Sequence, residues 1–133
     1  MIKETIELNV RYAETDQMGF VYYGNYAQYL EMARVAALKK IGISYKSLEE
    51  TGFLLPVSHY SINYLKAAKY DDCLSISALI RTMPTNKVVF EYEVYRGEDL
   101  LATAETTLVF MNEEGKACRP PTFFIAQLNP FFS

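Results

Sequence analysis

Apolar and polar residues alternate over several stretches of the chain, and this alternation predicts most of its regular structure. The first stretch, residues 5–12, has Ile6, Leu8, Val10 and Tyr12 on one side and predicts a strand with one buried face. Similar patterns, separated by turns rich in Gly, Pro, Asn and Asp, predict four more strands over residues 53–65, 74–80, 88–94 and 100–110.

The period changes to that of a helix between the first two predicted strands. Apolar residues recur at steps of three and four from Tyr26 to Ile41, with Asn25 as the expected cap and Gly42 as the stop. This helix is apolar on most sides, which is typical of a buried helix. Shorter helical turns are predicted over residues 44–50 and 123–128. The order of elements predicts an α+β fold in which one antiparallel sheet packs on one buried helix. A sheet with free edges and a helix this apolar also favour a partner subunit.

Length and charge narrow the class of protein. The chain has 133 residues, which fits a single domain over residues 1–133. Its net charge is -3 and the sequence contains no long basic run, so it lacks the positively charged surface that nucleic-acid binding requires. No apolar stretch approaches the length of a membrane span, and the start of the chain does not resemble a signal peptide. We therefore expect a cytoplasmic protein with Cys73 and Cys118 reduced. The single histidine, His59, argues against a His-rich metal site, and no metal or bound cofactor is expected.

The loop over residues 13–21 carries the most informative chemistry. Asp16 lies a few residues before the predicted helix, whose first backbone N–H groups lack intrahelical partners and carry partial positive charge. Such donors can stabilise an oxyanion, and a neighbouring carboxylate can act as a nucleophile or as a general base. Thioester hydrolysis needs little more, because a thiolate leaves readily. The structural alternative is that Asp16 is simply a cap or turn residue.

The motifs around this loop resemble the 4-hydroxybenzoyl-CoA thioesterase branch of the hotdog superfamily. The resemblance covers about residues 5–121 and rests on Thr15-Asp16-x-x-Gly19-x-Val21-x-x-x-Asn25-Tyr26, Glu31 and Arg34, Tyr70-Asp71-Asp72, and Gly115-x-x-x-Arg119. It implies a hotdog fold, in which a five-stranded antiparallel sheet wraps around one long central helix. It also implies a homodimer or homotetramer with active sites at the subunit interface.

The same resemblance suggests which residues form the site. Asp16 matches the catalytic aspartate, Gly19 the loop glycine, and Tyr23 the residue whose backbone N–H binds the oxyanion. Lys87 and Arg119 match positions that hold the phosphates of CoA in some members. The chain departs from the family pattern in two places: Glu14 stands where many members have an acid two residues before the aspartate, and Tyr23 stands where some bacterial members have a histidine.

Several alternatives remain open from the sequence. The acyl pocket is expected to involve Tyr22 and the strand from Val57 to Ser61, including His59, and an acyl carrier protein could present the substrate in place of CoA. A hotdog hydratase or dehydratase would need His59 in its site, and a non-enzymatic acyl-CoA-binding module would not need Asp16. Outside the family, His59 is expected to be a hydrogen-bonded core residue, Glu31 and Arg34 an i,i+3 ion pair, and Asp71-Asp72 a turn.

Overall fold

The structure is a computed structural model that describes residues 1–132; Ser133, the last residue of the predicted domain, lies outside them. The strands are β1 (Ile2–Asn9), β2 (Val57–Tyr64), β3 (Cys73–Ile80), β4 (Lys87–Arg96) and β5 (Asp99–Val109). The helices are α1 (Tyr23–Lys40), α2 (Tyr45–Glu50) and α3 (Thr122–Leu128), with 3₁₀ turns at Tyr12–Glu14 and Asn129–Phe131.

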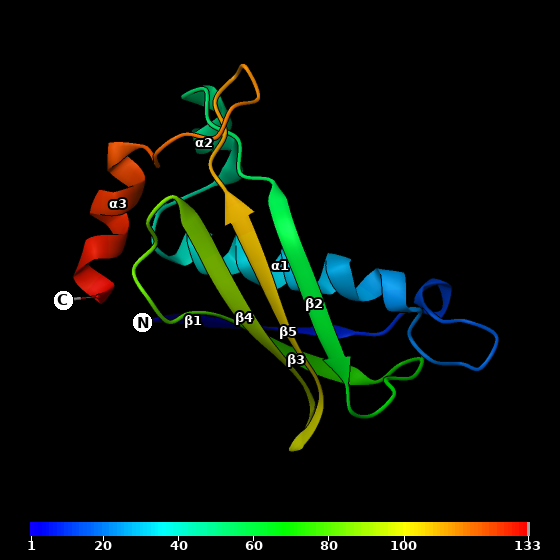
Figure 1. The fold of residues 1–133 in the computed structure, drawn as a ribbon. Helices are drawn as coiled ribbons and strands as arrows, with labels where there is room; N and C mark the ends of the chain where they lie inside the picture. The colour runs from blue at the N-terminus through cyan, green and yellow to red at the C-terminus, as the bar shows by residue number, and fades with distance from the viewer. Residues whose placement is uncertain (133) are drawn as a thin grey trace.

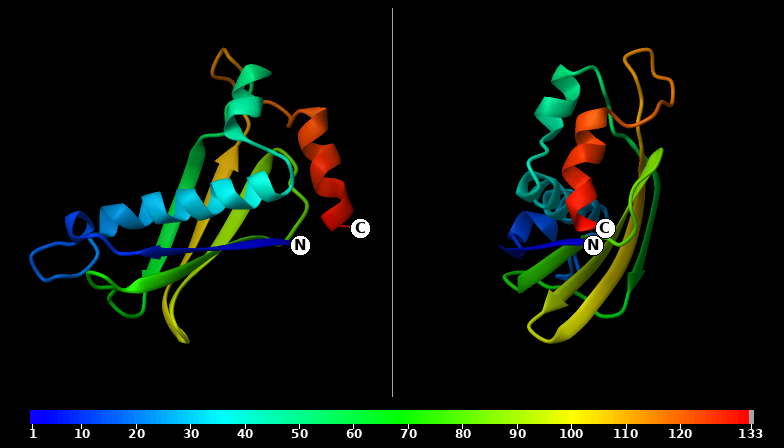
Figure 2. Two further views of the ribbon diagram at one scale, coloured as in Figure 1. Left: turned by 180° about the vertical axis from the view of Figure 1, so that it is seen from behind. Right: turned by 90° about the vertical axis from the view of Figure 1, so that its left-hand side faces the viewer.

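The five strands form one antiparallel sheet in the order β1-β3-β4-β5-β2, which confirms the predicted sheet. The sheet curves, and α1, which has 18 residues, lies across its concave side (Figures 1 and 2). The shorter α2 and α3 lie beyond the ends of the strands, and α3 lies near the N-terminus. None of the helices within residues 1–132 is long and apolar enough to cross a membrane.

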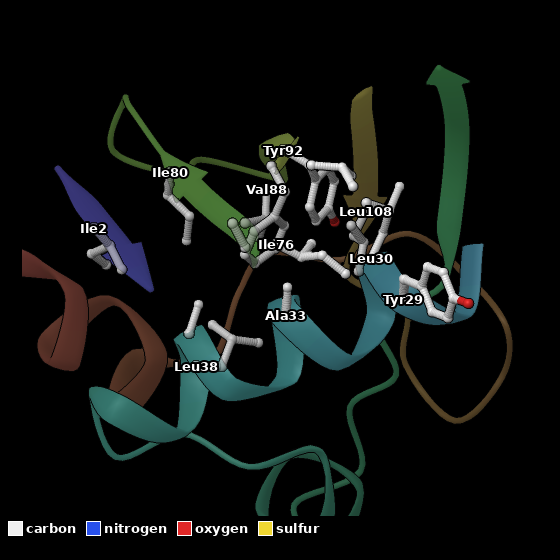
Figure 3. Close-up of a cluster of buried hydrophobic side chains, with 14 of the residues drawn as sticks. Ile2, Tyr29, Leu30, Ala33, Leu38, Ile76, Ile80, Val88, Tyr92 and Leu108 are labelled. Atoms are coloured by element: carbon white, nitrogen blue, oxygen red, sulfur yellow. The ribbon is translucent and has the colours of Figure 1, made fainter. Parts of the chain in front are cut away.

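The core lies between α1 and the concave face of the sheet. Leu30, Ala33 and Leu38 of α1 point toward the sheet, as Figure 3 shows. The predicted period-two faces of β3 and β4 are confirmed, because the following residues are all buried: Leu74, Ile76, Ala78, Ile80, Val88, Phe90, Tyr92 and Val94. In β5 the predicted inward Leu100 is only partly buried and Leu101 is fully buried, since a register shift separates Val94 from Tyr95 on the neighbouring strand.

Three predicted elements have other boundaries in the structure. The first strand begins at Ile2 and ends at Asn9, and Tyr12 is exposed because the chain enters a 3₁₀ turn in which Glu14 N–H donates to Arg11 O. The helix starts earlier, with Tyr22 as its N-cap. The second strand is shorter, because Leu54 forms only an isolated bridge to Met111. The predicted cap of α2 is confirmed, since Ser44 Oγ accepts the N–H of Ser47.

The strand β2 is an edge of the sheet, and only Ile62 among its eight residues is not exposed. Large apolar side chains contribute to this exposure, among them Val57, Tyr60 and Tyr64. A strand with a free edge and exposed apolar side chains is a ready surface for pairing with another chain.

Candidate active site

Asp16 lies in a tight loop between the 3₁₀ turn and α1. Its Oδ1 accepts the backbone N–H groups of Met18 at 2.9 Å and Phe20 at 3.3 Å, and its own N–H donates to Phe20 O. An isolated bridge between Thr15 and Val21 closes the loop at its base. These bonds fix the carboxylate through one oxygen, so the described structure leaves Oδ2 available to a water molecule or a substrate.

Gly19 completes this loop through its backbone conformation. Its φ of +80° lies in the region that favours glycine, and its N–H donates to Asp16 O at 3.0 Å. Because that N–H is already bonded, the contribution of Gly19 to the site lies in shaping the loop.

The start of α1 supplies the candidate oxyanion donors. Tyr22 is the N-cap and Asn25 N–H donates to Tyr22 O, so the N–H groups of Tyr23 and Gly24 are the first of the helix and have no intrahelical acceptor. The macrodipole of an 18-residue helix adds partial positive charge at this point. The predicted Asn25 cap is absent because the Asn25 side chain instead donates to Glu14 O at 2.9 Å.

A cavity of about 320 Å³ brings Asp16 and Tyr23 together. Its walls come from the Asp16 loop, the first turns of α1 and the segment after β2, and they include Phe20, Tyr26, Tyr64 and Lys66. Sequence reasoning missed the Tyr26–Tyr64 pair, whose ring centroids lie 5.2 Å apart, because nothing in the local pattern indicates that the end of β2 reaches α1. Tyr22 lies beside this cavity, with its ring 4.6 Å from that of Tyr23.

Glu14 connects the Asp16 loop to the helix. Its buried carboxylate accepts Arg11 N–H at 2.8 Å, the Arg11 guanidinium at 3.1 Å and the Tyr29 hydroxyl at 2.8 Å. Burial alone would raise the pKa of Glu14, but these hydrogen bonds outweigh it and hold the pKa below its usual value. Burial, and then the hydrogen bond to Glu14, raise the pKa of Tyr29, so that its hydroxyl remains a donor.

A second cavity, of about 200 Å³, lies farther along α1. Val57 and Tyr60 of β2 line it together with Glu31, Arg34 and Thr106. The predicted ion pair between Glu31 and Arg34 is not formed; buried Arg34 instead donates to the hydroxyls of Tyr45 at 2.9 Å and Tyr92 at 3.2 Å. The expectation of a buried, hydrogen-bonded His59 was also wrong, because His59 is exposed beside an irregularity in β2 and lines neither cavity.

Lys87 and Arg119 both lie near the C-terminal end of β5, away from Asp16. Lys87 pairs in register with Val109 of β5, and Cys118, the neighbour of Arg119, donates its N–H to Phe110 O. By contrast, Tyr64 beside Asp16 pairs with Ala102. Val109 and Ala102 are seven residues apart in β5, which corresponds to about 23 Å at about 3.3 Å per residue. Within this chain, the two cations therefore lie at the opposite end of β5 from Asp16.

Comparison with known proteins agrees with this fold. The thioesterase superfamily model matches residues 18–103. The chain therefore belongs to the thioesterase superfamily, adopts its hotdog fold, and is a thioester hydrolase. A putative acyl-CoA thioesterase of Bacillus subtilis, YneP, is 37% identical over 101 residues, which are 76% of this chain and 73% of that protein.

Solved structures of related proteins superpose over nearly the whole chain. A DHNA-CoA thioesterase from Staphylococcus aureus has a TM-score of 0.85 and 32% identity, covering 99% of this chain and 85% of the other. The 4-hydroxybenzoyl-CoA thioesterase from Pseudomonas sp. strain CBS-3 has a TM-score of 0.83 at 24% identity, covering 96% of this chain and 99% of the other, and this likeness concerns the fold alone.

Proposed function

We propose that this protein hydrolyses acyl-CoA thioesters to a free acid and CoA, with Asp16 as the catalytic carboxylate and the N–H groups at the start of α1 as the oxyanion site. The observation that carries the proposal is the cavity that Asp16 and Tyr23 line together, because it places a carboxylate and the first turn of an 18-residue helix around one space. Three relatives from Escherichia and Shigella strains, each 28% identical over 102 residues, are named acyl-CoA thioester hydrolases, which supports the substrate class.

In the general-base route, Asp16 removes a proton from a water molecule while the water oxygen attacks the thioester carbonyl carbon. The carbonyl oxygen becomes an oxyanion held by the Tyr23 and Gly24 N–H groups. The oxyanion then collapses, the carbon–sulfur bond breaks, and the thiolate of CoA takes the proton from Asp16. This chemistry requires no metal or bound cofactor.

In the nucleophilic route, Asp16 itself attacks the carbonyl carbon and expels the thiolate, and water then cleaves the resulting acyl anhydride. The free Oδ2 of Asp16 is compatible with both routes. Rapid quenching followed by peptide mass spectrometry distinguishes them, because only the nucleophilic route adds the mass of the acyl group to the peptide that contains Asp16.

The acyl group is proposed to lie along α1, between the helix and β2. Both cavities lie in this region. Tyr26 and Tyr64 line the cavity at the Asp16 end, and Val57 and Tyr60 line the cavity at the far end. Aromatic and aliphatic walls suit a medium aliphatic chain and an aromatic ring equally. A panel of CoA and acyl carrier protein thioesters would identify the acyl group and test whether a carrier protein presents it.

We further propose that the enzyme is a homodimer or homotetramer, with α1 as the central helix of each hotdog, acting in the cytoplasm, where reduced cysteines are stable. Two-fold antiparallel pairing of β2 with its copy would bring the Val57 end of one strand beside the Tyr64 end of the other. Lys87 and Arg119 of the partner subunit would then approach Asp16 of the first. A site shared between two subunits would account for the separation of these cations from Asp16 within one protomer.

The test of this function is the Asp16→Asn variant, which keeps the size of the side chain. We expect kcat to fall by about 100-fold or more with the fold intact, as for the loss of an essential base or nucleophile. Asp71→Asn is the matched control, because Asp71 is an exposed acid with φ of 65°, a conformation that asparagine tolerates. If Asp16→Asn hydrolyses acyl-CoA within a few-fold of the Asp71→Asn control, Asp16 is not catalytic.

A further inference from the structure

Glu14 lies in the 3₁₀ turn before α1 and forms hydrogen bonds with three residues at the start of that helix. Its backbone carbonyl accepts the N–H of Tyr22 at 2.8 Å and the side-chain amide of Asn25 at 2.9 Å. Its carboxylate accepts the hydroxyl of Tyr29 at 2.8 Å. One residue therefore binds the N-cap, the first turn and the second turn of the same helix.

These contacts fix the two halves of the candidate site relative to each other. Tyr22 immediately precedes the N–H groups of Tyr23 and Gly24, and Asp16 lies two residues after Glu14 in a loop closed by its own hydrogen bonds. The short segment through Thr15 is held as well, since the Thr15 hydroxyl donates to Tyr12 O at 2.7 Å. The separation between the Asp16 carboxylate and the oxyanion donors thus depends on how Glu14 is anchored.

We propose that Glu14 is a positioning residue for hydrolysis, which acts by holding Asp16 and the N-terminus of α1 in a fixed relative geometry, with Tyr29 as its anchor in the helix. The inference rests on the proposed roles of Asp16 and the helix start. Glu14 would thus contribute to catalysis although its carboxylate is buried and does not line the cavity. Holding reacting groups in position accounts for a large part of a rate enhancement, and a small displacement is costly in rate.

A solvent-exposed ion pair does not explain the burial of Glu14. The Arg11 side chain is 74% exposed, so its charge is screened by water and contributes little to binding the carboxylate. The buried partner is the Tyr29 hydroxyl. Glutamate has the reach to place one oxygen at the Arg11 N–H and the Tyr29 hydroxyl together, since its Oε1 accepts both.

The experiment compares Glu14→Gln and Tyr29→Phe with Glu7→Gln, a control at an exposed acid of β1. For each variant, kcat and KM for an acyl-CoA, the affinity for a non-hydrolysable acyl-CoA analogue, and Tm are measured. We expect kcat to fall about 10- to 100-fold in Glu14→Gln and about 3- to 10-fold in Tyr29→Phe, while KM and the analogue affinity change less than about 3-fold. Glu7→Gln should behave as the parent.

A purely structural role would give a different result. It would lower Tm and the folded fraction but leave kcat per folded molecule unchanged, and that outcome, or an unchanged kcat in both variants, overturns the proposal. If Glu14→Gln does not fold, Tyr29→Phe carries the test alone, because it removes only one hydroxyl. Asp16→Asn is measured in parallel: if it retains activity, the proposed function fails, whereas an inactive Asp16→Asn with fully active Glu14→Gln and Tyr29→Phe contradicts the positioning role alone.

Discussion

The guanidinium of Arg34 donates a 3.2 Å hydrogen bond to the hydroxyl of Tyr92, across the interface between α1 and the sheet. The Tyr92 hydroxyl also lies 2.6 Å from Thr106 Oγ1, so a buried polar chain runs from the helix through β4 to β5. Tyr45 completes the shell around the arginine with a second hydroxyl. All these partners are neutral, which makes Arg34 a buried cation held by hydroxyl groups.

This relationship predicts the effect of removing either partner. Tyr92→Phe leaves a buried guanidinium short of an acceptor, so we expect a loss of about 1–3 kcal/mol in the free energy of unfolding, measured by urea denaturation. Arg34→Met removes the charge and fills much of its volume, and it should cost less than Tyr92→Phe, because it leaves no buried cation without an acceptor. A greater loss in Arg34→Met than in Tyr92→Phe would indicate that the cation has a partner beyond these hydroxyls.

The lowered pKa of Glu14 predicts a pH dependence of stability. The folded-state pKa lies below the unfolded value of about 4.3, so the ionised carboxylate stabilises the fold above that value. The stabilisation is lost as the pH falls through the lower, folded-state pKa. We therefore expect the Tm difference between the parent and Glu14→Gln to be largest near neutral pH and to shrink below about pH 4. A Tm difference that is constant from pH 7 to pH 3 would contradict a charged, hydrogen-bonded Glu14.

Much of the fold follows from the sequence because its main signals are local. Period-two patterns identify the inner faces of β3 and β4, and Ser44 is recognisable as a cap from its place before a short helix. The ends of elements were harder to predict. Tyr12 continues the alternation of β1, yet it lies outside the strand, because the chain turns there and the backbone N–H of Arg11 donates to the Glu14 carboxylate. No pattern within residues 5–12 reveals that contact.

The candidate site was predictable only where a motif is continuous in sequence. Asp16, Gly19 and Tyr23 lie within one loop and one helix start, and the cavity brings Asp16 and Tyr23 together. Tyr64 and Tyr29 depend on tertiary contacts with residues far away in the chain, so their roles could not be predicted from spacing. Arg34 shows the same limit: a helical spacing of three from Glu31 suggested an ion pair, but the buried hydroxyls of Tyr45 and Tyr92 hold the guanidinium instead.

The free edge of β2 predicts how the proposed homodimer can be disrupted. Tyr60 is 38% exposed on this edge strand, and a lysine at an edge opposes strand pairing. We expect Tyr60→Lys to give a monomer by light scattering at micromolar concentration. Val89→Lys is the matched control, because Val89 is also 38% exposed but lies on the interior strand β4. If Tyr60→Lys keeps the parental mass, β2 is not the pairing edge.

A side chain at Gly24 is expected to displace the neighbouring ring of Tyr22, which lies beside the cavity. A Cβ at this position would lie 2.8 Å from Cε2 of the Tyr22 ring, which is the far end of an exposed side chain and can move. Gly24→Ala should therefore raise helix stability by up to about 1 kcal/mol while displacing Tyr22. If Tyr22 binds the acyl group, KM rises as Tm stays level or increases, and Tyr22→Ala should reproduce the change in KM. An unchanged KM in both variants would remove Tyr22 from the substrate-binding residues.

Lys87 and Arg119 are expected to bind the phosphates of CoA. A net charge of -3 means that binding an anionic substrate depends on local cations. We expect Lys87→Ala and Arg119→Ala to raise KM for acyl-CoA by about 3- to 30-fold with little change in kcat, because this is uniform binding. Acyl-pantetheine, which lacks the nucleotide phosphates, should be hydrolysed as by the parent. Equal losses on both substrates would make the two residues structural.

Their distance from Asp16 along β5 makes a sharper experiment possible, because the cations should act on the site of the partner subunit. The Asp16→Asn variant is mixed with the Lys87→Ala/Arg119→Ala double variant, and the two are unfolded together and refolded so that the subunits of the proposed homodimer exchange. If each site takes Asp16 from one subunit and the cations from the other, every hybrid dimer contains one fully intact site and one doubly defective site. A component with the parental KM should then appear, and it should be absent when the two samples are refolded separately before mixing. If all groups of a site came from one subunit, no hybrid would contain an intact site, and the parental KM would not return.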